Sequence, residues 1–155
     1  MNIGDIVRRN AKRYPDKAAI IFENQRFTFK ELNQRANMWA NALSHLGMEQ
    51  GDRIAVLSEA CNPCVEICCA AAKMGMVMAP INPHLPPQDI CYLTNNAKAL
   101  TLIVADEYKE MIHSLLPELI SAKNFIVIGP PWKEMMGYEE FLSSTLLRRA
   151  RGKTC

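Results

Sequence analysis

Four of the six cysteines lie within nine residues, at Cys61, Cys64, Cys68 and Cys69. The first three are spaced by three and four residues, which places them on one face of a helix. A CxxC pair at a helix start can bind a metal or carry out redox chemistry. One helix cannot wrap four thiolates around a metal ion, because Cys69 points about 100° away from the shared face. The spacing therefore favours small core residues, with a metal site or a redox pair at Cys61 and Cys64 as the alternatives.

The three histidines, His45, His84 and His113, are far apart in the sequence, and no Ser-His-Asp arrangement can be assigned to them. A nucleotide-binding enzyme usually holds phosphates in a glycine-rich loop, whose bare N–H groups approach the oxygens. The chain has seven glycines, and no two of them lie closer than four residues apart. Gly152 precedes a Lys-Thr pair, but the upstream glycine of a phosphate loop is missing. We therefore assign no catalytic, cofactor-binding or metal-binding residue from the sequence.

The net charge of +2 is unevenly distributed along the chain. Segment 148–155 carries four basic residues and no acidic one, whereas the rest is near neutral. No basic stripe follows a predicted element, so we expect no nucleic-acid partner. No apolar run approaches the length of about 18 residues that spans a membrane. The residues 1–17 are charged throughout and lack the apolar region of a secretory signal, which together with six cysteines indicates a reduced protein in the cytoplasm.

The elements that must position these residues can be read from the apolar spacing. Residues 3–14 predict an amphipathic helix, and Pro15 ends it. Two short strands, 18–22 and 26–28, predict a hairpin. Thr28 and Glu31 have the spacing of a capping box, in which each side chain bonds the other residue's backbone N–H. They therefore predict the start of a long helix that Gly47 stops.

From Arg53 onward, predicted strands alternate with predicted helices. This order requires crossover connections and predicts an α/β fold with a mainly parallel sheet and helices on both faces. The helix predicted over 62–74 is apolar nearly all round, which predicts cover on most sides, including cover by a neighbour outside this chain. The strands are expected at 53–58, 77–79, 100–104 and 125–128, and the other helices at 87–96, 106–116 and 138–147.

Four stretches of sequence resemble one known family. They are residues 10–20 (NAKRYPDKAAI), 27–32 (FTFKEL), 51–59 (GDRIAVLSE) and 70–83 (AAAKMGMVMAPINP). Together they resemble the start of the adenylate-forming superfamily, which contains acyl-CoA synthetases, luciferases and peptide-synthetase adenylation domains. Asn82 followed by Pro83, where peptide synthetases favour Asp, points toward the acyl-CoA synthetases.

The resemblance covers about residues 1–128 and implies a fold, an activity and cofactors. In the family, ATP and a carboxylate give an acyl-adenylate, and CoA then gives a thioester, so the full-length enzyme implies ATP, magnesium and CoA. The family's phosphate loop, adenine-contacting motif, magnesium-binding Glu and lid lysine come later, and no position of this chain matches them. The resemblance therefore implies scaffold roles for the matching residues and no cofactor held by this chain alone.

We expect residues 1–147 to form a truncated N-terminal subdomain of an AMP-dependent synthetase, and residues 148–155 to be a disordered basic tail. The expected function is that of an N-terminal fragment of an acyl-CoA synthetase of fatty acid metabolism, inactive alone. The alternative is a non-catalytic subunit that pairs with a synthetase or modulates it. In either case the expected partner is the missing remainder of the enzyme or a second chain.

Overall fold

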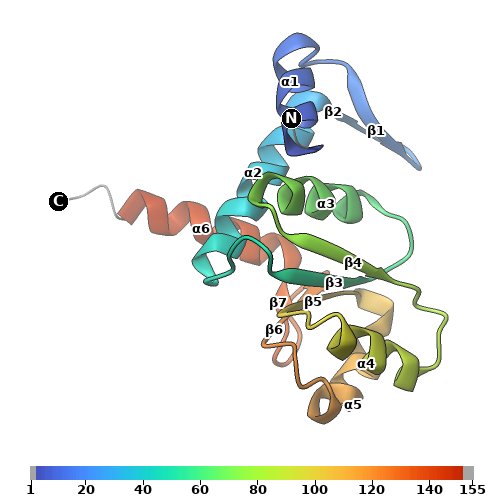
Figure 1. Cartoon of the computed structure of the whole chain (residues 1–155). Coiled ribbons are helices and arrows are strands. Elements are labelled where there is room, and N and C mark those ends of the chain that lie inside the picture. The colour runs from blue at the N-terminus through green and yellow to red at the C-terminus, as the bar shows by residue number, and fades with distance from the viewer. Residues whose placement is uncertain (1–2, 152–155) are drawn as a thin grey trace. The chain divides into compact units, whose positions relative to one another are not determined.

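The structure is a computed structural model that describes residues 3–151, and within them the chain divides into two compact units (Figure 1). The first, called here the helical unit, consists of Met1–Gly51 together with Ala60–Met76. The second, called the sheet unit, consists of Asp52–Glu59 together with Val77–Cys155. The chain therefore enters the sheet unit for one strand, returns to the helical unit for one helix, and enters the sheet unit again.

The helical unit contains a hairpin and three helices. The strands of the hairpin are antiparallel and meet at a tight turn, where Glu23 adopts a left-handed backbone with φ of 52°. Helix α3 packs against both α1 and α2, and α1 also contacts α2. The elements are α1 (Ile3–Arg13), β1 (Ala18–Phe22), β2 (Gln25–Thr28), α2 (Phe29–His45) and α3 (Asn62–Met74).

The capping box predicted at the start of α2 is confirmed. The Thr28 hydroxyl accepts a hydrogen bond from the Glu31 backbone N–H at 3.2 Å, and the Glu31 carboxylate accepts one from the Thr28 N–H at 2.8 Å. Two backbone donors that the helix cannot satisfy itself are thus satisfied by side chains. From this fixed start, the 3.6-residue period carries Leu32, Ala36 and Trp39 to buried positions.

Helix α3 has the bounds that the sequence predicts, with Pro63 in its first turn and Gly75 after its last. Gly75 adopts a left-handed conformation with φ of 68°, which a glycine reaches without strain. Within this chain, α1 and α2 cover much of α3, while Val65 and Cys68 stay exposed, so cover by a neighbour outside this chain stays a prediction. The approach of α1 is close: a Cβ added at Gly4 would lie 2.8 Å from the backbone of Lys73.

The sheet unit contains a five-stranded parallel sheet in the order β4-β3-β5-β6-β7. Its strands are β3 (Arg53–Leu57), β4 (Val77–Ile81), β5 (Thr101–Ala105), β6 (Asn124–Ile128) and β7 (Met136–Gly137). Its helices are α4 (Pro87–Asn96), α5 (Lys109–Leu115) and α6 (Tyr138–Arg151), with short 3₁₀ turns η1 (Asp106–Tyr108) and η2 (Leu116–Glu118) around α5.

The core of the sheet unit lies around the middle strand, β5, all five residues of which are buried. Alternate strand residues such as Leu57, Leu102 and Val104 form one apolar cluster with Ile90 of α4 and Ile112 of α5. Helix α6 packs against β6 and β7 and lies on the other side of the sheet (Figure 1). Burial on both faces explains why β5 reads as a continuous apolar run, and the predicted α/β fold is confirmed.

Three features of the sheet unit differ from the prediction, each for a physical reason. Strand β4 runs through Pro80 to Ile81, because β4 is an edge strand, where a sheet tolerates proline. The helix predicted over 106–116 is split into η1, α5 and η2, and Pro117 ends its regular part. Strand β7 has two residues, too few to show any periodicity.

Helix α6 continues to Arg151, four residues beyond its predicted end. The expected basic tail at 148–155 therefore begins inside α6, and its last residues, 152–155, lie outside the described part of the chain. Within residues 3–151, no helix combines the length and the apolar character needed to cross a membrane.

Candidate functional site

Four separate loops meet at the carboxyl ends of the parallel strands, and three of them carry polar side chains. Because β3, β4, β5 and β6 run in the same direction, the residues that follow them emerge at one edge of the sheet. Ligands of open α/β sheets bind outside this edge. Glu59 follows β3, His84 follows β4, Asp106 follows β5 and Gly129 follows β6. This edge is therefore the candidate functional site of the sheet unit.

An exposed histidine–glutamate contact joins the loops after β3 and β4. The Nε2 atom of His84 lies 2.6 Å from Oε1 of Glu59. The Asn82 side-chain oxygen accepts a hydrogen bond from the His84 backbone N–H at 2.9 Å, which fixes the turn that presents His84. A pair as exposed as this one contributes little to stability, so its importance lies in where it holds the imidazole.

The loops after β5 and β6 approach each other closely. A Cβ added at Gly129 would lie 2.9 Å from Oδ1 of Asp106, so a larger residue here would have to displace the Asp106 carboxylate. The same carboxylate oxygen lies 2.7 Å from Nζ of Lys109. Partial burial, reinforced by the negative charges of Glu59 and Glu107, raises the pKa of Tyr108.

A tryptophan beside this edge is surrounded by cations. The Trp132 ring has Nζ of Lys133 at 4.4 Å and Nζ of Lys109 at 5.6 Å from its centroid. The His113 ring meets it edge-on at a centroid distance of 5.4 Å, and His113 in turn lies 3.4 Å from the Glu134 carboxylate. The sequence pattern does not reveal this cluster, because its members come from the loop after β6 and from α5, which meet only in the folded unit.

A small hollow lies next to β7 and the first turns of α6. Its volume is about 260 Å³, below the range of pockets that usually enclose drug-sized ligands. We therefore assign no substrate to it. Its lining residues are Pro131, Lys133, Glu134, Met135, Met136, Glu140, Phe141 and Ser144.

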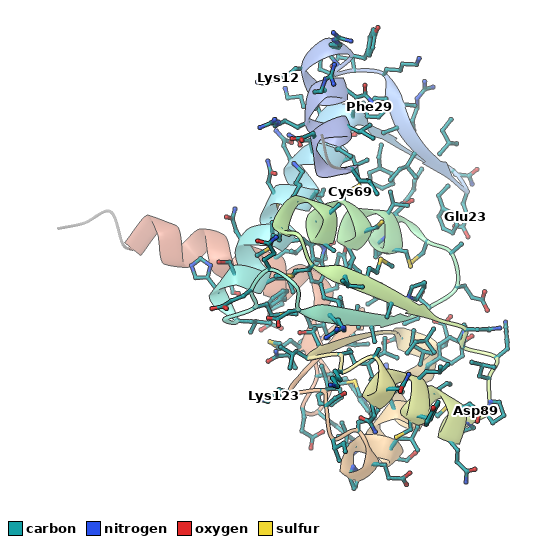
Figure 2. The ribbon with its side chains drawn as sticks, in the orientation of Figure 1. Lys12, Glu23, Phe29, Cys69, Asp89 and Lys123 are labelled. Carbon is teal, nitrogen blue, oxygen red and sulfur yellow. The ribbon has the colours of Figure 1, made fainter. Side chains whose placement is uncertain are left out.

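The cysteines fall into two groups by burial. Cys69 on α3 is buried, as predicted for a core residue (Figure 2), and Cys91 on α4 is buried as well. Cys68 is exposed, so the prediction of a core residue is wrong at that position. Burial, and the neighbouring Cys68, raise the pKa of Cys69 to about 11, and burial likewise raises the pKa of Cys91. Cys61 and Cys64 are only half-buried, and their sulfur atoms lie 3.3 Å apart. Within residues 3–151, no group of three or more Cys, His, Asp or Glu side chains is arranged to hold a metal ion.

Polar contacts between α2 and α3 occur inside the helical unit. The Arg35 guanidinium lies 3.2 Å from the carboxylate of Glu66, whose side chain is 5% exposed. The Lys73 ammonium donates to the side-chain oxygens of Asn33 and Asn37. Partial burial lowers the pKa of Lys73. These contacts join α2 to α3, so we interpret the residues as structural.

The motifs that the sequence singled out occupy structural positions. Residues 27–32 hold the capping box of α2, and residues 51–59 hold the glycine turn and strand β3. Residues 70–83 hold the end of α3, the left-handed Gly75 and the edge strand β4. The candidate site is built from the residues that directly follow these strands. The carboxyl ends of the predicted strands were therefore the sequence signal that could have located it.

A fold of this kind, with these motifs at these positions, is that of an adenylate-forming ligase. The chain belongs to the AMP-binding enzyme family, whose model matches residues 7–145.

Known proteins similar to the chain include CoA ligases and a peptide synthase. It is 28% identical over 123 residues to a crotonobetaine/carnitine–CoA ligase of Salmonella typhi, a match that covers 76% of the chain and 24% of the ligase. It is also 28% identical over 101 residues to bacitracin synthase 1 of Bacillus licheniformis, a match that covers 65% of the chain and 2% of that protein. The matched segment is therefore common to both kinds of enzyme.

A solved structure extends the likeness to three dimensions. The anthranilate CoA ligase AuaEII in complex with anthranoyl-AMP superposes with a TM-score of 0.88 and 26% identity. The superposition covers 93% of the chain and 28% of that structure. The chain spans about a quarter of the length of the curated CoA ligases it matches, 23% and 24% in two cases.

Proposed function

We propose that the chain is the N-terminal segment of an acyl-CoA synthetase. The whole protein would activate a carboxylate with ATP and magnesium to an acyl-adenylate and then transfer the acyl group to CoA. The observation that carries this proposal is the family match over residues 7–145, with CoA ligases among the relatives. Asn82 followed by Pro83 at the end of β4 supports the CoA-ligase branch over the peptide synthases.

Within such a synthetase, the segment serves as scaffold. The sheet unit holds the loops that carry Glu59, His84 and Asp106 at one edge of a buried sheet. The capping box and Gly75 set where α2 begins and α3 ends. On this proposal, residues 1–147 all belong to the N-terminal subdomain, and the acid is a fatty acid activated in the cytoplasm. Six cysteines, suited to a reducing compartment, support that location.

The segment does not catalyse adenylation by itself, on the same proposal. Its glycines are too dispersed for a phosphate loop, and it spans about a quarter of its CoA-ligase relatives. The test is ATP–pyrophosphate exchange by the purified chain with magnesium and a panel of fatty, aromatic and short carboxylates. We expect no exchange above a blank without enzyme. A full-length CoA ligase assayed with the same panel of carboxylates is the positive control and should give a signal. Exchange that depends on one carboxylate would overturn the proposal.

A second function is favoured by the edge of the sheet. Among the described residues, β4 pairs only with β3, so one side of its backbone is open, and Val77 on β4 is half exposed. Open strand edges are templates for pairing with another chain. The second candidate is thus a non-catalytic subunit that pairs with a synthetase or modulates it.

Copurification separates this candidate from the first. A tagged chain expressed in its own host should retain a second synthetase-related polypeptide in a fixed ratio. Val77→Lys should reduce that retention severalfold, because a charge on the edge strand opposes strand addition. Val65→Lys, which places the same charge at an exposed position of α3, is the matched control and should retain the partner. A chain that elutes as a monomer from the host, with neither variant differing from it, contradicts this second function.

A further inference from the structure

The start of α3 carries two thiols that the scaffold role does not use. Cys61 is the N-cap residue of α3, and Cys64 is the third residue of the helix. Their Sγ atoms lie 3.3 Å apart, within hydrogen-bonding distance of each other. Both side chains are half-buried, unlike the buried Cys69 and Cys91. Cys61 and Cys64 are therefore less buried than core residues should be, whereas Cys69 and Cys91 have the burial of core residues.

We propose that Cys61 and Cys64 form a reversible intramolecular disulfide, made and broken by exchange with low-molecular-weight disulfides such as oxidised glutathione. This dithiol site is separate from the acyl-CoA synthetase role and does not depend on it.

The local backbone explains why the two thiols meet. An N-cap side chain ordinarily turns over the first helical turn and reaches the N–H of the third helical residue. Cys61 has this extended backbone, with φ of −152° and ψ of 168°, and has no side-chain cap hydrogen bond. Its sulfur instead meets the side chain of that third residue, Cys64. The turn is closed by a hydrogen bond of 3.2 Å from the Cys64 N–H to the Cys61 carbonyl.

Closing the disulfide needs only a small movement. The bond length is about 2.05 Å, so the sulfurs must approach by about 1.3 Å. Rotation about the side-chain bonds of two half-buried residues supplies a movement of that size. The residues between them keep the backbone turn in place: Pro63 has a fixed φ, and the buried Asn62 donates to Oε1 of Gln25 at 3.3 Å.

The exchange balances in two steps. The thiolate of one cysteine attacks a sulfur of oxidised glutathione, which forms a mixed disulfide and expels one glutathione thiolate. The thiolate of the other cysteine then attacks the protein sulfur of that mixed disulfide and expels the second. Two protein thiols are oxidised, one glutathione disulfide is reduced, and the two thiol protons pass to the released thiolates. The N–H groups at the start of α3 favour the thiolate that each step requires.

The neighbouring pair Cys68 and Cys69 provides an internal comparison. These residues are adjacent on α3, so their side chains diverge by about 100°. Cys68 is exposed, whereas Cys69 is buried with a pKa raised to about 11. The same chain therefore holds one pair arranged for closure and one pair that is not, in the same helix and the same solution.

The test uses the full chain equilibrated with mixtures of oxidised and reduced glutathione, then acid-quenched and alkylated. Digestion after Glu59, Glu66 and Lys73 gives one peptide, 60–66, with Cys61 and Cys64, and another, 67–73, with Cys68 and Cys69. Peptide 60–66 should appear two hydrogens lighter and unalkylated. It should do so at a ratio of oxidised to reduced glutathione at least about tenfold lower than any disulfide in 67–73 requires.

Two variants and one solvent condition complete the design. In the Cys64→Ala variant, the exchange should stop at the mixed disulfide between Cys61 and one glutathione. The Cys68→Ala variant should form the 60–66 disulfide as the wild type does. In urea, the wild-type chain should need a ratio of oxidised to reduced glutathione at least about tenfold higher to close the disulfide, because the unfolded chain does not hold the turn. Equal closure in the folded and urea-unfolded chain would overturn the proposal. So would a peptide 60–66 alkylated at both thiols while Cys68 carries glutathione.

Discussion

The helical unit and the sheet unit are held together by different kinds of contact. In the helical unit, side chains bond backbone ends and bridge helices: Thr28 caps α2, and Arg35 reaches Glu66 from α2 to α3. In the sheet unit, the central strand β5 is buried along its whole length, and the first residues of α4 and α5 have no side-chain cap. The sheet unit also has polar contacts, such as that of Asp106 with Lys109, but what distinguishes it is a central strand that is buried along its whole length. What distinguishes the helical unit is the capped start of α2 and the ion pair between its helices.

This difference teaches where each unit is vulnerable. Apolar burial is spread over many atoms, so a single deletion is costly in proportion to the cavity it leaves. A cap or an ion pair is one contact, with a cost set by whether its partner stays buried. The chain offers a separate reporter for each unit, since it has two tryptophans: buried Trp39 lies in the helical unit and half-buried Trp132 in the sheet unit. Labelling with 5-fluorotryptophan gives one fluorine resonance per unit, which urea titrations can follow.

The largest effect is expected in the middle of the sheet. Leu102→Ala should lower the free energy of unfolding reported by Trp132 by about 3 kcal/mol, because Leu102 is fully buried in β5 and its loss leaves a cavity. Ile120→Ala is the matched control, since Ile120 is 82% exposed, and should change that free energy by less than about 0.5 kcal/mol. Similar losses for both variants would mean that β5 is not the core of the unit.

The next effect should appear at the ion pair between α2 and α3. Arg35→Ala should lower the free energy of unfolding reported by Trp39 by about 2 kcal/mol, because the 5%-exposed Glu66 carboxylate loses a cationic donor. Arg8→Ala breaks the exposed pair with Asp5 in the same unit and should cost less than about 0.5 kcal/mol. If the two variants unfold at the same urea concentration, the pair between Arg35 and Glu66 contributes no more to stability than an exposed pair does, and the proposed polar stabilisation of the helical unit is contradicted.

A smaller loss is expected at the cap of α2. Thr28→Ala should cost about 1 kcal/mol, because the Glu31 N–H loses its acceptor. Lys30→Ala, at an exposed position of the first turn, should be within about 0.5 kcal/mol of the wild type. Thermal unfolding followed by circular dichroism measures both. A stability for Thr28→Ala that matches Lys30→Ala would show that the capping box is dispensable.

The smallest effect at neutral pH concerns Cys69. Burial raises the pKa of its thiol from 9.0 to about 11, so the folded state keeps the proton where the unfolded state has lost it. Its contribution to stability is complete below pH 9 and is lost as the pH rises from about 9 to about 11. Cys69→Ala should therefore lose less stability than the wild type over this window, in urea titrations at several pH values. Cys68→Ala should lose as much as the wild type, and identical pH profiles for all three proteins would contradict the raised pKa.

Local signals predicted most of the elements. The capping box placed the start of α2, and Pro63 with Gly75 bounded α3 at the residues the structure shows, because caps and breakers act through neighbouring backbone. The candidate site was not predicted. Glu59 and His84 are distant in the sequence, and only parallel pairing of β3 with β4 brings them to 2.6 Å.

The sequence by itself determined the family, the alternation of strands and helices, the start of α2 and both ends of α3. These features depend on residue spacing within a few turns or on motifs read directly from the chain. Only the tertiary structure decided the strand order β4-β3-β5-β6-β7, the place of Pro80 on an edge strand and the meeting of the Cys61 and Cys64 thiols. Strand order depends on non-local pairing, and the thiol contact depends on the side-chain rotations of an N-cap. Neither is encoded in periodicity, so a three-dimensional arrangement was needed to find them.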